Sequence, residues 1–235
     1  MALAISVRNL NVDRSKKPIL KDITLNLPAG QVYGLLGPNG SGKTTLLRTI
    51  MGLQRIASGD VDVLGKPAGD KYLRSRIGYS TQSASVYSDM TCLENIDFFK
   101  TLYPKTSRSA QEMLRQFRLE DHSNQMASTL SGGQRTLLAL ITSLVGNPEL
   151  LILDEPTVGI DLVLRRELWA FLKTLTAGGM TVVVTSHVMD DADNCDDLIL
   201  LQDGQVLAQG TPSSLREKTG EKEMEDVFIS LVGEK

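Results

Sequence analysis

The amino-acid sequence predicts an α/β fold with a mostly parallel β-sheet, an N-terminal antiparallel β subdomain and an inserted helical subdomain. From residue 147 onwards, short apolar runs typical of buried strands alternate with helical patterns, an order typical of a parallel sheet. Between residues 83 and 146 the periodicity becomes helical, which predicts the insertion. The first 30 residues hold short β-like stretches that lead into a turn, which predicts the antiparallel unit.

Each predicted element rests on its own local pattern. Strands are assigned where apolar residues alternate with polar ones, or run together over about four to eight positions, before a turn. The predicted strands are 4–10, 23–27, 31–36, 59–65, 77–82, 150–153 and 181–185, followed by a hairpin at Asp203 and Gly204. Helices are assigned where apolar residues recur every three or four positions. The predicted helices are 45–50, 92–99, 113–117, 136–145 and 164–175.

The chain length and the changes of pattern indicate one domain with an insertion. A chain of 235 residues can bury a substantial core. We expect residues 1–82 and 147–215 to form the catalytic α/β core and residues 83–146 to form the helical subdomain. Residues 216–235 are rich in charge, end in an apolar patch and predict a helical tail.

Composition narrows the classes of function. The chain is 41% hydrophobic and 23% charged, with a net charge of −3 and no basic block, so we expect no nucleic-acid partner. Apolar runs such as 150–153 fall far below the roughly 18 residues of a membrane span, and the start lacks a secretion signal. Cys92 and Cys195 stand alone and predict buried, reduced thiols. We therefore expect a cytoplasmic protein.

One short motif predicts the chemistry of the chain. It matches the pattern G-x-x-x-x-G-K-[ST] of a phosphate-binding loop, between a predicted strand and a predicted helix. Its nucleotide-binding residues are Gly37, Pro38, Asn39, Gly40, Ser41, Gly42, Lys43, Thr44 and Thr45. The glycines let backbone N–H groups approach phosphate oxygens, Lys43 supplies a positive charge, and the Thr44 hydroxyl is placed to bind Mg²⁺. The alternative, a chance glycine-rich turn, does not explain this flanking context.

Two adjacent carboxylates follow the predicted buried strand 150–153. A buried strand that ends in Asp154 and Glu155 needs a cationic or catalytic partner at that point. Asp154 is the candidate Mg²⁺ residue, acting through water or Thr44. Glu155 is the candidate base that polarises the attacking water. The alternative is an acidic helix cap before the next turn.

A second anion site is predicted at the start of the helical run 136–145. Ser131, Gly132, Gly133 and Gln134 precede this run, and helix N-termini attract anions. A monomer that hydrolyses one nucleotide needs only one such site. The economical explanation is a head-to-tail dimer in which the Ser131 loop of one chain caps the nucleotide of the other. The alternative is a solvent-exposed helix start.

Together these residues resemble the ATP-binding subunit of an ABC transporter, most closely the bacterial exporter type. The motifs that carry the resemblance are, in order, the phosphate loop, Gln82, residues 130–134, Asp154 with Glu155, Asp161, and His187. They span essentially the whole chain, and residues 130–134 are far more specific than the phosphate loop. The resemblance implies a P-loop NTPase core of the RecA-like type that takes ATP and Mg²⁺.

The resemblance also implies roles for residues that spacing alone does not assign. Gln82 resembles the glutamine that contacts Mg²⁺ and senses the membrane partner. His187 resembles the switch histidine that contacts the γ-phosphate and, with Lys43 and Glu155, would complete the catalytic set. Asp161 resembles the D-loop aspartate that meets the opposing chain, and it can also cap the next helix. His122 is interpreted as structural.

Three departures from the family pattern concern contacts outside the catalytic groups. The family usually offers an aromatic ring to adenine where this chain has Arg14, whose guanidinium plane can stack instead. Thr81 stands before Gln82 where proline is common. The helix after Gln134 is more apolar than usual.

The resemblance implies a dimer of ATPase chains that energises a separate transmembrane permease, as a homodimer or a heterodimer. Residues 90–99 would form part of the docking surface for the permease, and the C-terminal tail favours export over import. The chain would then lie at the inner face of the cell membrane through its permease. One alternative is an ABC ATPase that acts on ribosomes or DNA, which the single cassette and the lack of a heptad run disfavour. A non-hydrolysing regulatory subunit is disfavoured by Glu155.

Overall fold

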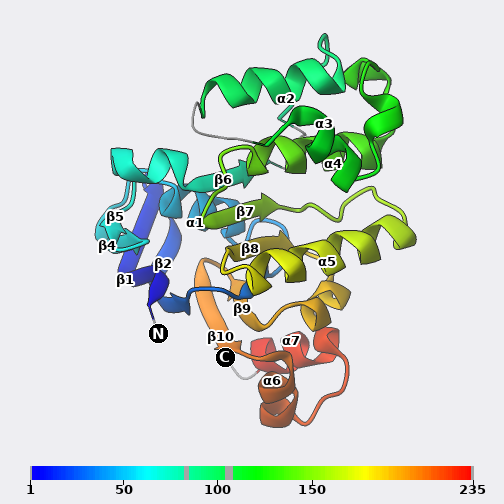
Figure 1. The fold of residues 1–235 in the computed structure, drawn as a ribbon. Coiled ribbons are helices and arrows are strands. Elements are labelled where there is room, and N and C mark those ends of the chain that lie inside the picture. The colour runs from blue at the N-terminus through cyan, green and yellow to red at the C-terminus, as the bar shows by residue number, and fades with distance from the viewer. Residues whose placement is uncertain (1, 82–84, 104–107, 234–235) are drawn as a thin grey trace.

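A six-stranded sheet forms the centre of the molecule (Figure 1). The computed structural model describes residues 2–81, 85–103 and 108–233. The strands lie in the order β10 (Gln205–Gly210), β9 (Asp197–Gln202), β3 (Val32–Leu36), β8 (Thr181–Ser186), β7 (Leu150–Asp154) and β6 (Ile77–Ser80). All neighbours pair in parallel except β10 with β9. The prediction of a mostly parallel sheet is confirmed.

A smaller antiparallel sheet packs beside the first, as predicted for the N-terminal part of the chain. Its order is β2 (Lys17–Pro28), β1 (Leu3–Arg14), β4 (Ser58–Val63) and β5 (Lys66–Pro67). Strands β1 and β2 extend beyond the predicted 4–10 and 23–27 because irregular residues interrupt their alternation. Asn9 and Asp22 have φ angles of 46° and 50°, and the strand register shifts beside them. Such bulges hide a long strand from a search for strict alternation.

Helices cover both faces of the central sheet. They are α1 (Lys43–Ile50), α2 (Cys92–Thr101), α3 (Ala110–Gln116), α4 (Gly132–Leu144), α5 (Leu162–Ala177), α6 (Pro212–Thr219) and α7 (Met224–Gly233). Helices α2, α3 and α4 gather beyond the β6 edge, while α6 and α7 lie at the opposite end of the molecule (Figure 1). The predicted helical character of the insertion and of the tail is thus observed. The domain boundaries themselves stay a prediction.

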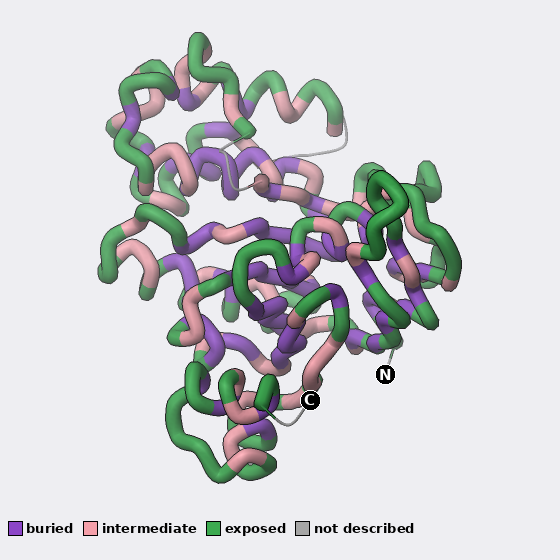
Figure 2. Tube along the Cα trace, turned by 180° about the vertical axis from the view of Figure 1, so that it is seen from behind, coloured by how far each residue is buried: buried purple, intermediate pink, exposed green. Residues whose placement is uncertain are grey.

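The core consists of two apolar layers, one on each face of the central sheet. Along β7, Leu151 and Leu153 face a layer shared with α4 and α5, while Leu150 and Ile152 face a layer shared with α1 and the antiparallel sheet. This explains why the strand is a continuous apolar run, since both of its faces are covered. The buried stretches in Figure 2 follow these strands through the middle of the molecule.

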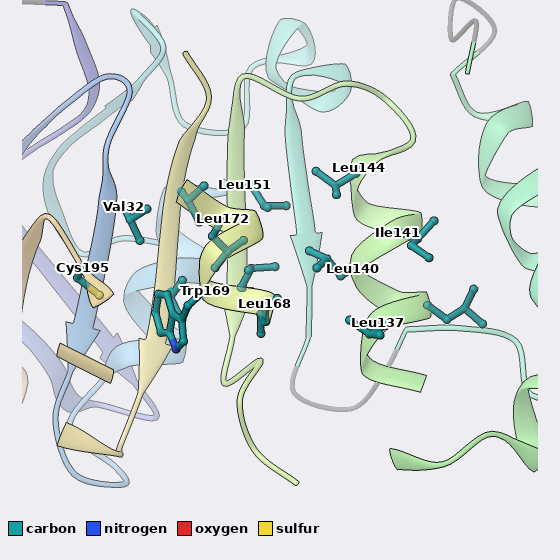
Figure 3. Packing of buried hydrophobic residues seen from close by; sticks show 14 of the residues in the cluster. Val32, Leu137, Leu140, Ile141, Leu144, Leu151, Leu168, Trp169, Leu172 and Cys195 are labelled. Atoms are coloured by element: carbon teal, nitrogen blue, oxygen red, sulfur yellow. The ribbon is translucent and has the colours of Figure 1, made fainter. Parts of the chain in front are cut away.

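Helices α4 and α5 present their apolar faces to the sheet. Figure 3 shows Leu140 and Leu144 of α4 turned toward the strands. Trp169 and Leu172 of α5 lie in front of the strands in the same view. All four side chains are at least 96% buried, and Leu172 is fully buried. This layer holds the start of each helix at a fixed position relative to the sheet.

Two further expectations can be compared with the fold. Cys92 and Cys195 are buried, free thiols, and burial raises the pKa of the Cys195 thiol far above its usual value. Within the described part of the chain, no helix combines the length and the apolar character needed to cross a bilayer.

Candidate active site

The phosphate-binding loop connects the buried strand β3 to helix α1. Gly42 caps the helix with a φ of 109°, a backbone conformation that glycine adopts without strain. Gly37 lies so close to the neighbouring strand that a Cβ there would be 2.1 Å from the carbonyl oxygen of Leu201. Glycine at both positions therefore permits the tight path of the loop.

The phosphate loop holds the buried ammonium group of Lys43. Lys43 is 6% exposed, and its Nζ donates to the carbonyl oxygens of Gly37 at 2.7 Å and Pro38 at 3.1 Å. Burial lowers the pKa of Lys43, and the nearby carboxylates of Glu155 and Asp154 oppose this shift. These contacts close the loop around the ammonium group.

Ser41 supplies evidence that the loop is shaped for an anion. Its Oγ is buried and has no hydrogen-bond partner among the described residues. Buried polar atoms are nearly always satisfied, so an unsatisfied one at this point indicates a missing acceptor or donor. A phosphate oxygen would accept the Ser41 hydroxyl proton, and the helix N-terminus would favour its charge.

Asp154 lies at the end of β7, next to the first turn of α1. Its Oδ2 accepts from Thr44 Oγ1 at 3.3 Å, and its Oδ1 accepts from Thr185 Oγ1 at 2.6 Å. Hydroxyl and carboxylate oxygens are ligands that Mg²⁺ prefers, so Thr44 and Asp154 fit the ion. In the described ranges no group of three or more His, Cys, Asp or Glu side chains could hold a metal.

Thr185, a residue that the sequence does not single out, joins the two acidic residues. While its Oγ1 donates to Asp154, it accepts from the backbone N–H of Glu155 at 2.9 Å. Glu155 has a φ of 55°, a conformation that a non-glycine residue adopts only where its surroundings hold it. The Thr185 hydroxyl is one of the contacts that hold the Glu155 backbone in this conformation.

The carboxylate of Glu155 lies beside the ring of His187. Glu155 Oε1 lies 3.2 Å from His187 Nδ1, and the side chains are 9% and 39% exposed respectively. His187 follows β8 directly, while Glu155 follows β7, and these strands are neighbours in the sheet. The structure thus brings together a first set of predicted residues: the phosphate loop with Lys43 and Thr44, Asp154, Glu155 and His187.

The second predicted anion site is a well-formed helix start. Ser131 Oγ accepts from the Gln134 backbone N–H at 3.2 Å, and Gln134 Oε1 accepts from the Ser131 backbone N–H at 2.9 Å. This reciprocal pair is a capping box, so α4 begins at Gly132 rather than at residue 136. A Cβ on Gly133 would be 2.8 Å from a side-chain methyl of Leu164, so α4 and α5 approach closely at this point.

Asp161 lies beside this helix start. It caps α5, accepting from the backbone N–H groups of Val163 at 2.9 Å and Leu164 at 3.0 Å. A cavity of about 560 Å³ lies between the two helix starts, lined among others by Ser131, Gly132 and Asp161. None of the first set of residues lines it. The second set of predicted residues therefore consists of Ser131, Gly132, Gly133, Gln134 and Asp161.

Two predicted site residues remain without a structural test. Gln82 lies outside the described residues. Arg14 ends β1 with an exposed side chain, opposite Lys17 in the hairpin. Strand β2 of that hairpin does reach the phosphate loop, because a Cβ on Gly42 would lie 2.7 Å from Leu20. The stacking of Arg14 on a base stays a prediction.

The sequence analysis missed Asp191, which is the hydrogen-bonding centre behind the site. Its Oδ2 accepts from Thr157 at 2.8 Å and Ser186 at 2.7 Å. Its Oδ1 accepts from Arg165 at 2.7 Å and 3.0 Å and from Trp169 at 3.0 Å. Asp191 is fully buried, and it ties the segment after Glu155, the residue before His187 and helix α5 together. The only hint in the sequence is an acidic pair, Asp190 and Asp191, three and four residues after His187.

The comparisons with known proteins decide the family. The sequence profile described as "ABC transporter" matches residues 20–158, which is more than half of the chain. The chain belongs to the ABC transporter family. The matched segment contains the phosphate loop, the Ser131 loop, Asp154 and Glu155, so the motif-based prediction of family and fold is confirmed. The chain is an ATPase domain of this family.

Two curated relatives are ATP-binding proteins by name, one of Nod factor export and one of a probable multidrug ABC transporter. The Nod factor export ATP-binding protein I of Rhizobium meliloti (strain 1021) is 36% identical over 220 residues, covering 91% of this chain and 66% of that protein. The probable multidrug ABC transporter ATP-binding protein YbhF of Escherichia coli (strain K12) is 36% identical over 205 residues, covering 85% and 36%. The chain thus spans about a third to two thirds of the length of these relatives.

One solved structure shows the family fold with reaction products. The ATP-binding cassette MJ0796, a dimer in a post-hydrolysis state bound to ADP and Pi, superimposes with a TM-score of 0.80. It is 28% identical in sequence, and the match covers 88% of this chain and 98% of MJ0796.

We predict that Asp191→Asn lowers the free energy of unfolding by about 3 kcal/mol, because it leaves the Arg165 guanidinium without its buried counter-charge. The matched control is Asp193→Asn, whose ion pair with Arg216 is solvent-exposed and should cost less than about 1 kcal/mol. Urea denaturation of both variants measures the difference. Equal stability of the two would show that the Asp191 network contributes no more than a surface ion pair.

Proposed function

We propose that this chain is the ATP-hydrolysing subunit of a membrane exporter and that it works as a dimer. The observation that carries the proposal is the separation of the two sets of residues within one chain. Lys43, Glu155 and His187 belong to the phosphate-loop set, whereas Ser131 and Asp161 line a cavity that none of those residues reaches. A second chain, placed head to tail, would bring its Ser131 loop to the nucleotide of the first.

Within each site, this chain's own residues divide the work of hydrolysis. The buried Lys43 ammonium and the α1 N-terminus would bind the phosphates, and Ser41 Oγ would donate to a phosphate oxygen. Glu155 would accept the proton of the attacking water, and His187, in contact with Glu155, would donate toward the γ-phosphate. Thr44 and Asp154 would hold Mg²⁺, which neutralises charge on the transferring phosphoryl group.

The closed dimer would be favoured only while ATP is intact. The start of α4 has the backbone N–H groups of Gly132 and Gly133 and the hydroxyl proton of Ser131, which suit a terminal phosphate. Hydrolysis removes that contact, so the preference for the closed state is lost. The dimeric MJ0796 relative with ADP and Pi supports this arrangement.

Helix α2 offers a surface for the membrane subunit. Asn95 is fully buried, accepts from the Tyr87 N–H at 2.7 Å and donates to the Tyr87 and Thr91 carbonyls at 3.0 Å each. It thereby fixes the loop that leads into α2. Beside it, Tyr87 and Phe98 stack edge to face, with ring centroids 4.8 Å apart, yet remain 44% and 36% exposed. Exposed aromatic rings on a rigid support suit a partner helix.

The names of two relatives support the proposed direction of transport. Nod factor export and multidrug transport appear in the names of two relatives, which supports export. The proposed location is the inner face of the cell membrane, where ATP is available and the permease partner is embedded. The transported substrate would be determined by that permease.

Glu155→Gln should retain ATP binding but lower kcat by about 10²- to 10⁴-fold, because the amide cannot accept the proton of water. An ATPase assay and size-exclusion chromatography in Mg-ATP test this, and the variant should accumulate as a dimer. Glu217→Gln, an exposed change on α6, should behave as wild type. Normal turnover by Glu155→Gln would exclude Glu155 as the base.

Ser131→Arg should bind ATP through its intact phosphate loop yet lose about 100-fold or more in kcat, because the bulky side chain blocks the opposing site. Ser213→Arg places the same change in the exposed first turn of α6 and should leave kcat unaltered. Nucleotide titration and steady-state ATPase rates separate binding from turnover. Unchanged turnover in Ser131→Arg contradicts the shared-site dimer.

Phe98→Asp should reduce recovery of a multi-span membrane protein with the tagged chain by about tenfold, since it places a charge among docking aromatics. The ATPase activity of the isolated chain should persist. Leu53→Asp, at a residue 69% exposed outside α2, is the matched control. Recovery of ribosomes or DNA in place of a membrane protein would favour a non-transport ABC ATPase.

A further inference from the structure

A relay of side chains brackets the Ser131 loop. Gln134 Oε1 accepts from the Ser131 backbone N–H, and Gln134 Nε2 lies 2.9 Å from His122 Nε2. His122 Nδ1 lies 2.6 Å from Gln125 Oε1. Gln125 Nε2 donates to the carbonyl oxygen of Thr129 at 3.1 Å and to its Oγ1 at 3.0 Å. The relay thus begins and ends on the backbone on either side of Leu130.

Backbone chemistry at the two ends determines the direction of every hydrogen bond in the relay. The Ser131 N–H can only donate, so Gln134 must turn its oxygen to it and its amino group to His122. The Thr129 carbonyl can only accept, so Gln125 must turn its amino group to it and its oxygen to His122. His122 therefore accepts at Nε2 and donates at Nδ1. Only one neutral tautomer of histidine does both.

The relay stands on a fixed support. His122 ends a short 3-10 helix (Glu120–His122), and the residues after it pair with the start of α2. Cys92 N–H donates to the Gln125 carbonyl at 3.1 Å, and Leu93 N–H donates to the Ser123 carbonyl at 3.0 Å. His122 is half-buried, so its ring is held in place while its bonds stay within reach of solvent. Because the His122 ring is held in place, its acceptor nitrogen Nε2 stays directed at the Gln134 amino group.

We infer that His122 is a positioning residue for the ATPase reaction. In its Nδ1-protonated neutral form it holds the Gln134 amide in the one orientation that caps Ser131 and so shapes the loop for the opposing chain's nucleotide. The inference rests on the proposed function, because it assigns His122 to the loop that acts in the second site. In this role His122 contacts neither the nucleotide nor the attacking water.

Replacements of His122 separate this role from simple packing. Glutamine keeps one acceptor and one donor, so His122→Gln can maintain the relay. Lysine has only donors, so in His122→Lys the Gln134 oxygen would turn to the ammonium and the Gln134 amino group would face the Ser131 N–H. Two opposed donors break the capping box. His122→Phe fills the space but offers no polar partner.

The experiment measures kcat, ATP affinity of the monomer and ATP-driven dimerisation for these three variants. His122→Lys and His122→Phe should lower kcat about fivefold, as expected from the loss of a helix cap, and should weaken dimerisation in a Glu155→Gln background. ATP affinity of the monomer should not change, because the phosphate loop is intact. His122→Gln should stay near wild type. Asp121→Asn, an exposed change in the same 3-10 helix, is the matched control.

A charge-pair rescue gives the sharpest test. With Gln134→Glu, one carboxylate oxygen accepts from the Ser131 N–H and the other accepts from a lysine at position 122, so the capping box re-forms. The double variant His122→Lys/Gln134→Glu should therefore have a higher kcat than His122→Lys alone. A purely structural loss would show as a lowered Tm that the second change does not restore.

Failure of the His122 role and failure of the proposed ATPase dimer give different results. The positioning role is overturned if His122→Lys has the kcat of wild type, or if Gln134→Glu does not rescue it. In that case the dimer is still supported, provided that the unmodified chain hydrolyses ATP and Ser131→Arg does not. If wild type neither hydrolyses ATP nor dimerises with it, or if Ser131→Arg is fully active, the proposed function fails and the inference falls with it.

Discussion

Backbone pairing between three parallel strands places every group of the phosphate-loop set. Leu36 of β3 pairs with Ser186 of β8, and Asp154 of β7 pairs with Thr185 of β8, so the three strands end at one edge. The phosphate loop, the acidic pair and His187 follow those ends directly. Ligands of open parallel sheets bind at this edge, where loops diverge and helix N-termini point. A slip of one residue in this pairing would turn Asp154 toward the wrong face.

Buried polar side chains convert that coarse placement into a defined geometry. Thr185 donates to Asp154 and accepts from the Glu155 backbone, so one hydroxyl sets the relation between the two acids. Asp191 takes five hydrogen bonds from groups on three segments, which satisfies a carboxylate that has no contact with water. Such groups are costly to bury, but once satisfied they allow a single arrangement.

The second set is organised by local chemistry on a shared support. The capping box at Ser131 needs only residues three apart, yet it lies against α5 and Asp161, whose position depends on the apolar layer over the sheet. His122 adds a second hydrogen bond to the Gln134 amide, in the orientation that the capping box requires. A loop that must receive another chain's nucleotide is thus held by bonds within its own chain.

By itself the sequence determined what depends on neighbouring residues or on continuous patterning. The glycines and Lys43 of the phosphate loop, the cap at Ser131 and the apolar run before Asp154 belong to this class, because each is a short-range requirement of backbone or burial. Parallel strands and inserted helices were predictable for the same reason.

The tertiary structure decided the rest. Contacts such as Glu155 with His187 join residues far apart in the chain, and bulges at Asn9 and Asp22 break the alternation on which strand prediction relies. Asp191 and His122 gained their roles only from what folding placed around them, which no local pattern records.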